Sequence, residues 1–116
     1  MTVQEIAVLL DARWLSCEEE AQRQIYAAFA SDMMSDVLAY VTEDTLLLTG
    51  LVNSQSMRTC EMLDVPCVVF VRGKEPLQDA LRIAREIGLP ALTTPYTMFE
   101  ACGRLYEAGL PPVKLG

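Results

Sequence analysis

Short apolar segments alternate with segments of helical pattern along most of this chain, and that alternation is the feature that most restricts its fold. The apolar segments are almost continuous, which is typical of strands in a parallel sheet covered by helices on both faces. Four such strands are predicted, at residues 25–30, 45–50, 66–73 and 90–94. The fold class is therefore predicted to be α/β, with a mostly parallel sheet of four or five strands.

A helical pattern follows each predicted strand. The four helices are expected at residues 31–41, 53–64, 75–88 and 95–109. Two of these helices begin with side chains that can accept hydrogen bonds from a helix start, and the last two end with glycine. The candidates for the starts are Ser31 or Asp32 and Asn53 or Ser54, with Pro76 suited to a first turn.

Residues 1–28 are expected to add a helix and a strand to one edge of this sheet. Thr2 and Glu5 have the spacing of a capping box at the head of a short amphipathic helix. Residues 12–16, ARWLS, predict a short strand. At 116 residues the chain is expected to form a single domain over residues 1–116.

The composition argues against several classes of function. Nine basic and 16 acidic residues give a net charge of −7, which disfavours nucleic-acid binding. The chain has no histidine, so it lacks the commonest general base and the commonest metal ligand. We therefore expect no enzymatic activity, no cofactor and no bound metal.

The cysteines and the N-terminus point to a cytoplasmic protein. The four cysteines, at positions 17, 60, 67 and 102, include no close pair of metal ligands and are expected to be buried free thiols. The first ten residues contain Glu5 and no basic leader, so no signal peptide is predicted. No apolar segment reaches the roughly 20 residues that a membrane span needs, so no membrane association is expected.

A glycine–lysine pair at Gly73 and Lys74 raises the question of a phosphate-binding P-loop. That motif places another glycine five positions before the glycine of the pair, and a serine or threonine after the lysine. Here those two positions hold Val68 and Glu75. Gly73 and Lys74 therefore do not belong to a P-loop, and the pair gives no indication of an ATP-using enzyme.

The loops between the predicted strands and helices form the candidate site, because in a parallel sheet they lie at one carboxyl edge. Unpaired N–H groups, two cations and several hydroxyls there would suit an anionic ligand such as a phosphate or a nucleotide. The candidate ligand-binding residues are Ser31, Asp32, Thr49, Asn53, Ser54, Arg72, Lys74, Thr93, Thr94 and Tyr96. The alternative is that the polar side chains only cap helices and the two cations only keep the loop soluble.

Gly103 lies inside the last predicted helix, where glycine costs up to about 1 kcal/mol relative to alanine. Close packing against another backbone, either the sheet or a second subunit, would explain it. Tyr96, Phe99 and Tyr106 would then line that contact. The tail LPPVKLG, residues 110–116, is expected to be a loose end or a strap that docks a partner.

Four segments, in order along the chain, carry a resemblance to the DRTGG domain family: ASDMMSDVLA, LLLTGLVNSQ, CVVFVRGKEP and LPALTTPYTMFEACGRLYEAGL. The resemblance covers residues 29–109, and this region is also similar to the N-terminal, non-catalytic domain of HPr kinase/phosphorylase. It implies an α/β regulatory or ligand-sensing domain without catalytic activity, often paired as a homodimer. Some stand-alone relatives are associated with redox and hydrogenase systems, which implies a protein partner of that kind.

The chain departs from this family at the namesake motif. Where the pattern has Gly-Asp-Arg-Thr after Thr-Gly, this sequence has TGLVNSQ at residues 49–55, so a ligand contact made by that charged pair would be absent or altered. Three functions stay open. They are a sensor of an anionic metabolite, a homodimeric interaction module without a small ligand, and an enzyme with carboxylate or thiol chemistry, which has the least support.

Overall fold

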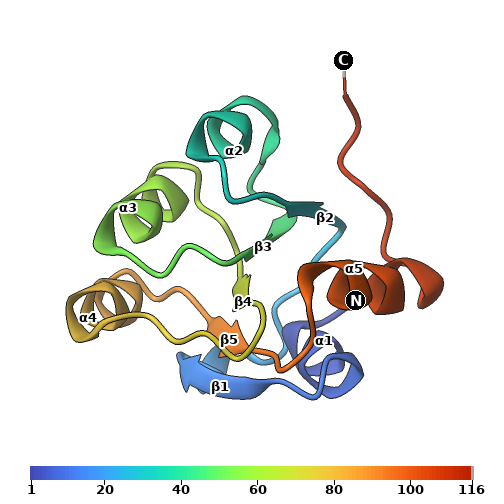
Figure 1. Ribbon diagram of the computed structural model, residues 1–116, viewed down its shortest axis with the longest axis horizontal. Coiled ribbons are helices and arrows are strands. Elements are labelled where there is room, and N and C mark those ends of the chain that lie inside the picture. Colours follow the sequence, from blue (N-terminus) through green and yellow to red (C-terminus); the bar gives the residue numbers. More distant parts are fainter. Residues whose placement is uncertain (116) are drawn as a thin grey trace.

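The computed structural model describes residues 1–115 as a three-layer α/β sandwich (Figure 1). A five-stranded sheet forms the middle layer, in the order β1-β5-β4-β3-β2. Strands β2 to β5 are parallel, and β1 pairs with β5 in the antiparallel direction. The strands are β1 (Arg13–Ser16), β2 (Ala27–Ala30), β3 (Thr45–Thr49), β4 (Val68–Phe70) and β5 (Ala91–Thr93). The predicted fold class is confirmed, including a strand from the N-terminal region at one edge.

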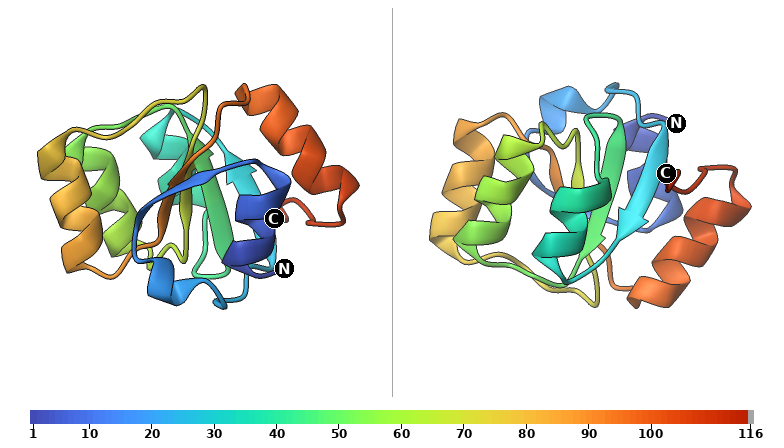
Figure 2. Two further views of the ribbon diagram at one scale, coloured as in Figure 1. Left: turned by 90° about the horizontal axis from the view of Figure 1, so that it is seen from below. Right: turned by 90° about the horizontal axis from the view of Figure 1, so that it is seen from above.

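Helices cover both faces of the sheet, but unequally (Figure 2). α2, α3 and α4 connect consecutive parallel strands and pack on what we call the three-helix face. α1 and α5 pack on the opposite, two-helix face. The helices are α1 (Val3–Leu9), α2 (Met34–Tyr40), α3 (Ser54–Met62), α4 (Gln78–Glu86) and α5 (Met98–Glu107), and a 3-10 turn, η1, spans Glu18–Glu20.

Neighbouring side chains of the central strands enter two separate cores. Leu47 and Phe70 belong to the core beneath the three-helix face. Leu46 and Leu48 belong to the core beneath α1 and α5. All four side chains are fully buried, and each contributes about 1.5–3 kcal/mol through removal from water. The need to fill both cores explains why the strands are apolar at consecutive positions.

Two of the predicted helix starts are confirmed. The Thr2 hydroxyl accepts a hydrogen bond from the Glu5 N–H, and Glu5 Oε1 accepts one from the Thr2 N–H, each at 3.1 Å. Asn53 Oδ1 accepts from the Ser56 N–H at 2.8 Å, which caps α3. Both contacts satisfy N–H groups that a helix leaves unpaired at its first turn.

Two other predicted helix starts are wrong. α2 follows Met33 and has no side-chain cap, because the Ser31 hydroxyl accepts from the Met33 N–H at 2.9 Å and Asp32 bonds to the end of β3 instead. α4 begins at Gln78, so Pro76 precedes the helix and is not in its first turn.

The tail is attached to the chain's own sheet. The Ala28 N–H donates to the Pro111 carbonyl at 3.0 Å, and the Val113 N–H donates to the Ala28 carbonyl at 3.3 Å. The tail therefore covers part of the outer edge of β2, and the expectation of a loose end is wrong for residues 110–113. The predicted packing of Gly103 against the sheet is also wrong, since a Cβ at Gly103 would meet no atom within 4 Å.

Within residues 1–115, no helix is long and apolar enough to cross a bilayer. In the same range, no three His, Cys, Asp or Glu side chains are grouped so that they could hold a metal ion. All four cysteines are free, with Cys60 and Cys67 buried and Cys17 and Cys102 partly exposed.

Candidate functional site

The loops that follow β2, β3, β4 and β5 lie at one edge of the sheet, because these strands are parallel and in register. β3 occupies the middle of this arrangement, with β2 on one side and β4 on the other. The residues just after β3 are therefore within reach of both neighbouring loops. Gly50, the first residue after β3, lies at that central point.

Asp32, from the loop after β2, reaches across to the end of β3. Its Oδ1 atom accepts a hydrogen bond from the Gly50 N–H at 2.6 Å and another from the Thr49 hydroxyl at 3.0 Å. The Thr49 hydroxyl in turn accepts from the Leu51 N–H at 3.1 Å. Hydrogen bonds to an ionised carboxylate are about twice as strong as neutral ones, so Asp32 holds the loop after β2 against the end of β3.

Arg72 and Lys74, from the loop after β4, approach the same point from the other side. The Lys74 Nζ donates to the Gly50 carbonyl at 3.3 Å. A Cβ placed on Gly50 would lie 3.1 Å from Arg72 Nη2 and 3.3 Å from Asp32 Oδ2. The Arg72 guanidinium and the Asp32 carboxylate therefore border the same space above Gly50 without forming an ion pair, and any larger residue at Gly50 would push them aside.

Both cations are exposed and have no carboxylate partner within residues 1–115. Arg72 has a positive φ of 59°, a left-handed conformation that costs a non-glycine residue roughly 1 kcal/mol or more. Gly73 follows with φ 67°. The tight turn places the Arg72 side chain toward β3, and its strain is offset by the loop's hydrogen bonds to the neighbouring β5–α5 loop.

The loops after β4 and β5 are closed against each other. α4 and α5 lie on opposite faces of the sheet, and adjacent parallel strands with this divergence usually open a ligand crevice between their carboxyl ends. Here three hydrogen bonds close that crevice. Arg72 N–H donates to the Tyr96 carbonyl at 2.8 Å, Gly73 N–H to the Thr94 carbonyl at 2.7 Å, and the Thr93 hydroxyl to the Lys74 carbonyl at 2.6 Å.

The hydroxyls of Thr93 and Thr94 both have protein partners. Thr94 is fully buried, and its hydroxyl donates to the Leu10 carbonyl at 2.6 Å. The Tyr96 ring packs beneath the guanidinium of Arg104, with 4.2 Å from Cζ to the ring centre. These three residues connect the β5–α5 loop to the rest of the fold and present few free groups to solvent.

The ten predicted site residues thus fall into two groups. One group meets around Gly50: Asp32, Thr49, Arg72 and Lys74. The other group consists of Ser31, Asn53, Ser54, Thr93, Thr94 and Tyr96, which lie at the same edge. In this second group, Ser31 bonds within a turn, Asn53 caps α3, Thr93 and Thr94 bond to carbonyls of other segments, and Tyr96 packs against Arg104. The Ser54 side chain forms no hydrogen bond within residues 1–115.

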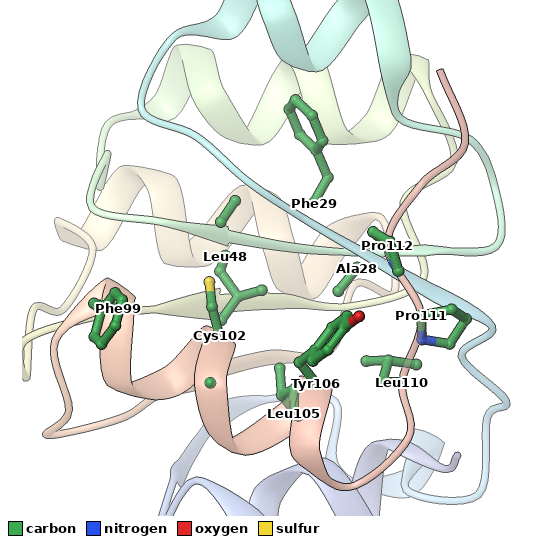
Figure 3. Close-up of a pocket in the computed structure, with 12 residues that line it drawn as sticks. Ala28, Phe29, Leu48, Phe99, Cys102, Leu105, Tyr106, Leu110, Pro111 and Pro112 are labelled. Carbon is green, nitrogen blue, oxygen red and sulfur yellow. The ribbon is translucent and has the colours of Figure 1, made fainter. Parts of the chain in front are cut away.

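A second feature is an apolar groove on the two-helix face (Figure 3). The sequence indicated several of its residues, but not that they form a groove with β2. The groove has a volume of about 370 Å³ and lies between α5, β2 and the tail. Phe99, Cys102 and Tyr106 extend along α5, and Pro111 and Pro112 close the side formed by the tail. We call this feature the α5 groove. Its sequence signals were Gly103, which lines the groove, and the neighbouring aromatic residues Phe99 and Tyr106.

The α5 groove is bordered by exposed aromatic side chains. Phe99 is 89% exposed and Tyr106 is 71% exposed, although both belong to a helix whose other side is buried. Burial raises the pKa of the Cys102 thiol above its ordinary value, so this cysteine stays protonated at neutral pH. The groove therefore presents an uncharged, apolar surface.

Two comparisons with known proteins give a match. The family model described as the DRTGG domain matches residues 5–108. Among solved structures, the crystal structure of the CBS and DRTGG domains of the regulatory region of Clostridium perfringens pyrophosphatase, complexed with the activator diadenosine tetraphosphate, is similar with a TM-score of 0.77. The identity is 17%, over 95% of this chain and 47% of that one, so the chain spans about half of that structure and the likeness concerns the fold. No curated protein matches the chain.

Proposed function

The chain belongs to the DRTGG domain family, and from that premise we propose that it is a non-catalytic regulatory module that senses an anionic metabolite or nucleotide at the carboxyl edge of its sheet. The observation that carries the proposal is the position of Arg72 and Lys74. Both cations converge on the backbone of Gly50 and neither has a carboxylate partner within residues 1–115.

The net charge of the chain supports a binding role for Arg72 and Lys74. The chain carries a net charge of −7, yet Arg72 and Lys74 both approach Gly50 without a carboxylate partner within residues 1–115. An arginine can bind a phosphate through two parallel N–H donors, while a lysine contributes a point charge. Together they would suit a phosphate group held above Gly50.

The family supports a regulatory role. In the C. perfringens pyrophosphatase, the DRTGG domain is part of a regulatory region whose activator is a nucleotide, diadenosine tetraphosphate. A role of the same kind would need this chain to bind a ligand and pass the effect to a partner. It would need no chemical step, and we assign none.

A thermal-shift screen against nucleotides and phosphorylated metabolites tests the proposal. A ligand at about 100 times its Kd stabilises a protein by about 2.7 kcal/mol, which raises the Tm of a domain of this size by several degrees. We expect Arg72→Ala and Lys74→Ala to lose most of the shift. Arg82→Ala is the matched control, because Arg82 is an exposed arginine on α4 whose nearest acid, Glu86, lies 3.9 Å away. An equal shift in all four proteins would rule out this placement of the site.

The α5 groove favours a second role, association with another copy of this chain. Phe99, Gly103 and Tyr106 all line the groove, and their spacing of four and three residues places them on one side of α5, with Gly103 between the two aromatic positions along the helix. In a two-fold pair of antiparallel α5 helices, Phe99 of one copy would meet Tyr106 of the other, and Gly103 would let the backbones approach. Aromatic side chains bury roughly 150–250 Å² each, a large part of the about 800 Å² per partner in a stable interface.

Sedimentation velocity over a range of concentrations tests this pairing. We expect a dimer for the wild type, and weaker dimers for Phe99→Ala and Gly103→Leu, since the leucine would fill the crossing point. Met62→Ala is the control, because Met62 is an exposed apolar residue on α3, away from the groove. A wild-type protein that stays monomeric at high micromolar concentration would remove this role and leave the ligand site untouched.

A further inference from the structure

Asp32 occupies the hydrogen-bond donors that a bound anion would use at the carboxyl edge. Its Oδ1 atom accepts from the Gly50 N–H at 2.6 Å and from the Thr49 hydroxyl at 3.0 Å. Backbone N–H groups and side-chain hydroxyls are common donors to phosphate oxygens. In this structure a carboxylate of the chain itself takes that place.

The surroundings of Asp32 are those of an anion site. Arg72 Nη2 and Asp32 Oδ2 come within 3.1 Å and 3.3 Å of the same point above Gly50, and Lys74 Nζ bonds to the Gly50 carbonyl at 3.3 Å. Asp32 nevertheless forms no ion pair with either cation among residues 1–115. A phosphate group with three or four oxygens could contact the Gly50 N–H, Arg72 and Lys74 together, which one carboxylate does not.

The segment held by Asp32 has few other attachments. α2 is a helix of seven residues, begins without a side-chain cap and fully buries only Val37. Met33, Leu38 and Tyr40 in and beside it are exposed. The Ser31 N–H also donates to the Leu48 carbonyl at 3.0 Å, and Met34 packs against the core of the three-helix face. The bonds of Asp32 to β3 are therefore one of a few restraints on this loop, and the one that a competing anion would remove.

We propose that Asp32 is an internal competitor for the anion site, so that a phosphate-bearing ligand binds at Gly50 by displacing the Asp32 carboxylate and thereby releases the start of α2. This inference rests on the proposed function and adds two things to it. Asp32 lowers the affinity for anions and so selects ligands with enough charge to replace it. Its displacement converts binding into a change at the β2–α2 loop, which a partner could detect.

Calorimetric titration of the full chain with inorganic pyrophosphate tests the competition. We expect Asp32→Asn and Asp32→Ala to bind pyrophosphate about tenfold or more tightly than the wild type, a difference of about 1.4 kcal/mol or more. Arg72→Ala is expected to bind at least tenfold more weakly. Asp36→Asn is the control for net charge, because Asp36 is an exposed acid on α2 that forms no bond to Gly50.

Hydrogen exchange provides a second readout. Saturating pyrophosphate is expected to speed exchange at residues 31–37 of the wild type, because the restraint on the loop is lost. In Asp32→Asn the amide oxygen can still accept from the Gly50 N–H, so the fold should be retained, while the competing negative charge is removed. This variant therefore replaces Asp32→Ala in the test if Asp32→Ala does not fold.

Each other outcome is decisive. If pyrophosphate binds the wild type and Arg72→Ala loses it, but the Asp32 variants bind no more tightly, the competition is disproved and the proposed function stands. If Asp36→Asn gains as much affinity as Asp32→Asn, the effect is one of overall charge and the competition is disproved. If no variant binds pyrophosphate or any nucleotide of the screen, both the competition and the proposed function fail.

Discussion

The two faces of the sheet are covered to different extents, and two phenylalanines show the difference. Phe70 is fully buried beneath the three helices of one face, while Phe99 on α5 of the other face is 89% exposed. Three helices close the first face over its whole width. Two helices leave the part beside β2 open, where the α5 groove forms. The three-helix face therefore encloses its aromatic side chain, while the two-helix face leaves apolar surface exposed beside β2.

The largest expected effect is at Phe70, on the closed face. Phe70→Ala would remove a ring from a packed core and leave a cavity, at a cost of about 3–5 kcal/mol in the free energy of unfolding. Urea denaturation followed by circular dichroism measures this loss. A loss below about 1 kcal/mol would show that the three-helix face is loosely packed, contrary to the comparison.

A smaller effect is expected at Thr94, which connects the end of β5 to the N-terminal region on the two-helix face. Thr94→Val keeps the shape but leaves the buried Leu10 carbonyl without its donor, at a cost of about 1–3 kcal/mol. Thr94→Ser keeps the hydroxyl and should lose less. If valine and serine cost the same, the 2.6 Å hydrogen bond contributes nothing.

A third effect is a pH dependence from Cys60, in the core of the closed face. Burial raises the pKa of this thiol from an ordinary value near 9 to about 12. Because the folded value is the higher one, the stability due to the protonated thiol is complete below about pH 9 and is lost as the pH rises toward 12. The slope is up to about 1.4 kcal/mol per pH unit.

Unfolding of the wild type and of Cys60→Ala at pH 8, 9 and 10 measures this term. The slope above pH 9 should be smaller in Cys60→Ala. Cys102→Ala is the comparison on the open face, where the thiol is only partly buried. Cys102→Ala should reduce the slope above pH 9 by less than Cys60→Ala does. Equal slopes in all three proteins would contradict the assignment.

The smallest effect is expected at Phe99 itself. Phe99→Ala in the monomer should change the free energy of unfolding by no more than about 0.5 kcal/mol, as for other exposed positions. Denaturation at a concentration where the chain is monomeric isolates this term from association. A loss above about 1 kcal/mol would mean that Phe99 supports the fold, and the contrast between the two faces would not hold.

Much of the fold could be predicted from the sequence, because strand after strand is apolar at consecutive positions and each is followed by a helical pattern. The Asn53 cap followed from the same local rules and is confirmed. The predicted role of Asp32 as a helix cap is wrong, since its carboxylate finds the Gly50 N–H, 18 positions further along the chain. Local sequence propensity cannot predict such a contact between two loops.

The site could be predicted only as a set of residues at one edge. Which of them meet at Gly50 depends on the left-handed turn at Arg72 and on the closing of the β4 and β5 loops. The α5 groove depends on how α5 is rotated over the sheet, which periodicity does not fix. The cytoplasmic location, the likeness to the N-terminal domain of HPr kinase and an association with redox enzymes stay predictions.

The pairing of β1 with β5 has a consequence for how the chain assembles during synthesis. Strands β2 to β5 each lie beside the next one along the chain, but Arg13 of β1 pairs with Thr93 of β5. A ribosome adds roughly 5–20 residues per second, so β1 emerges seconds before its partner exists. It is therefore expected to dock last, and a nascent chain stalled before β5 should expose β1 to proteases and chaperones.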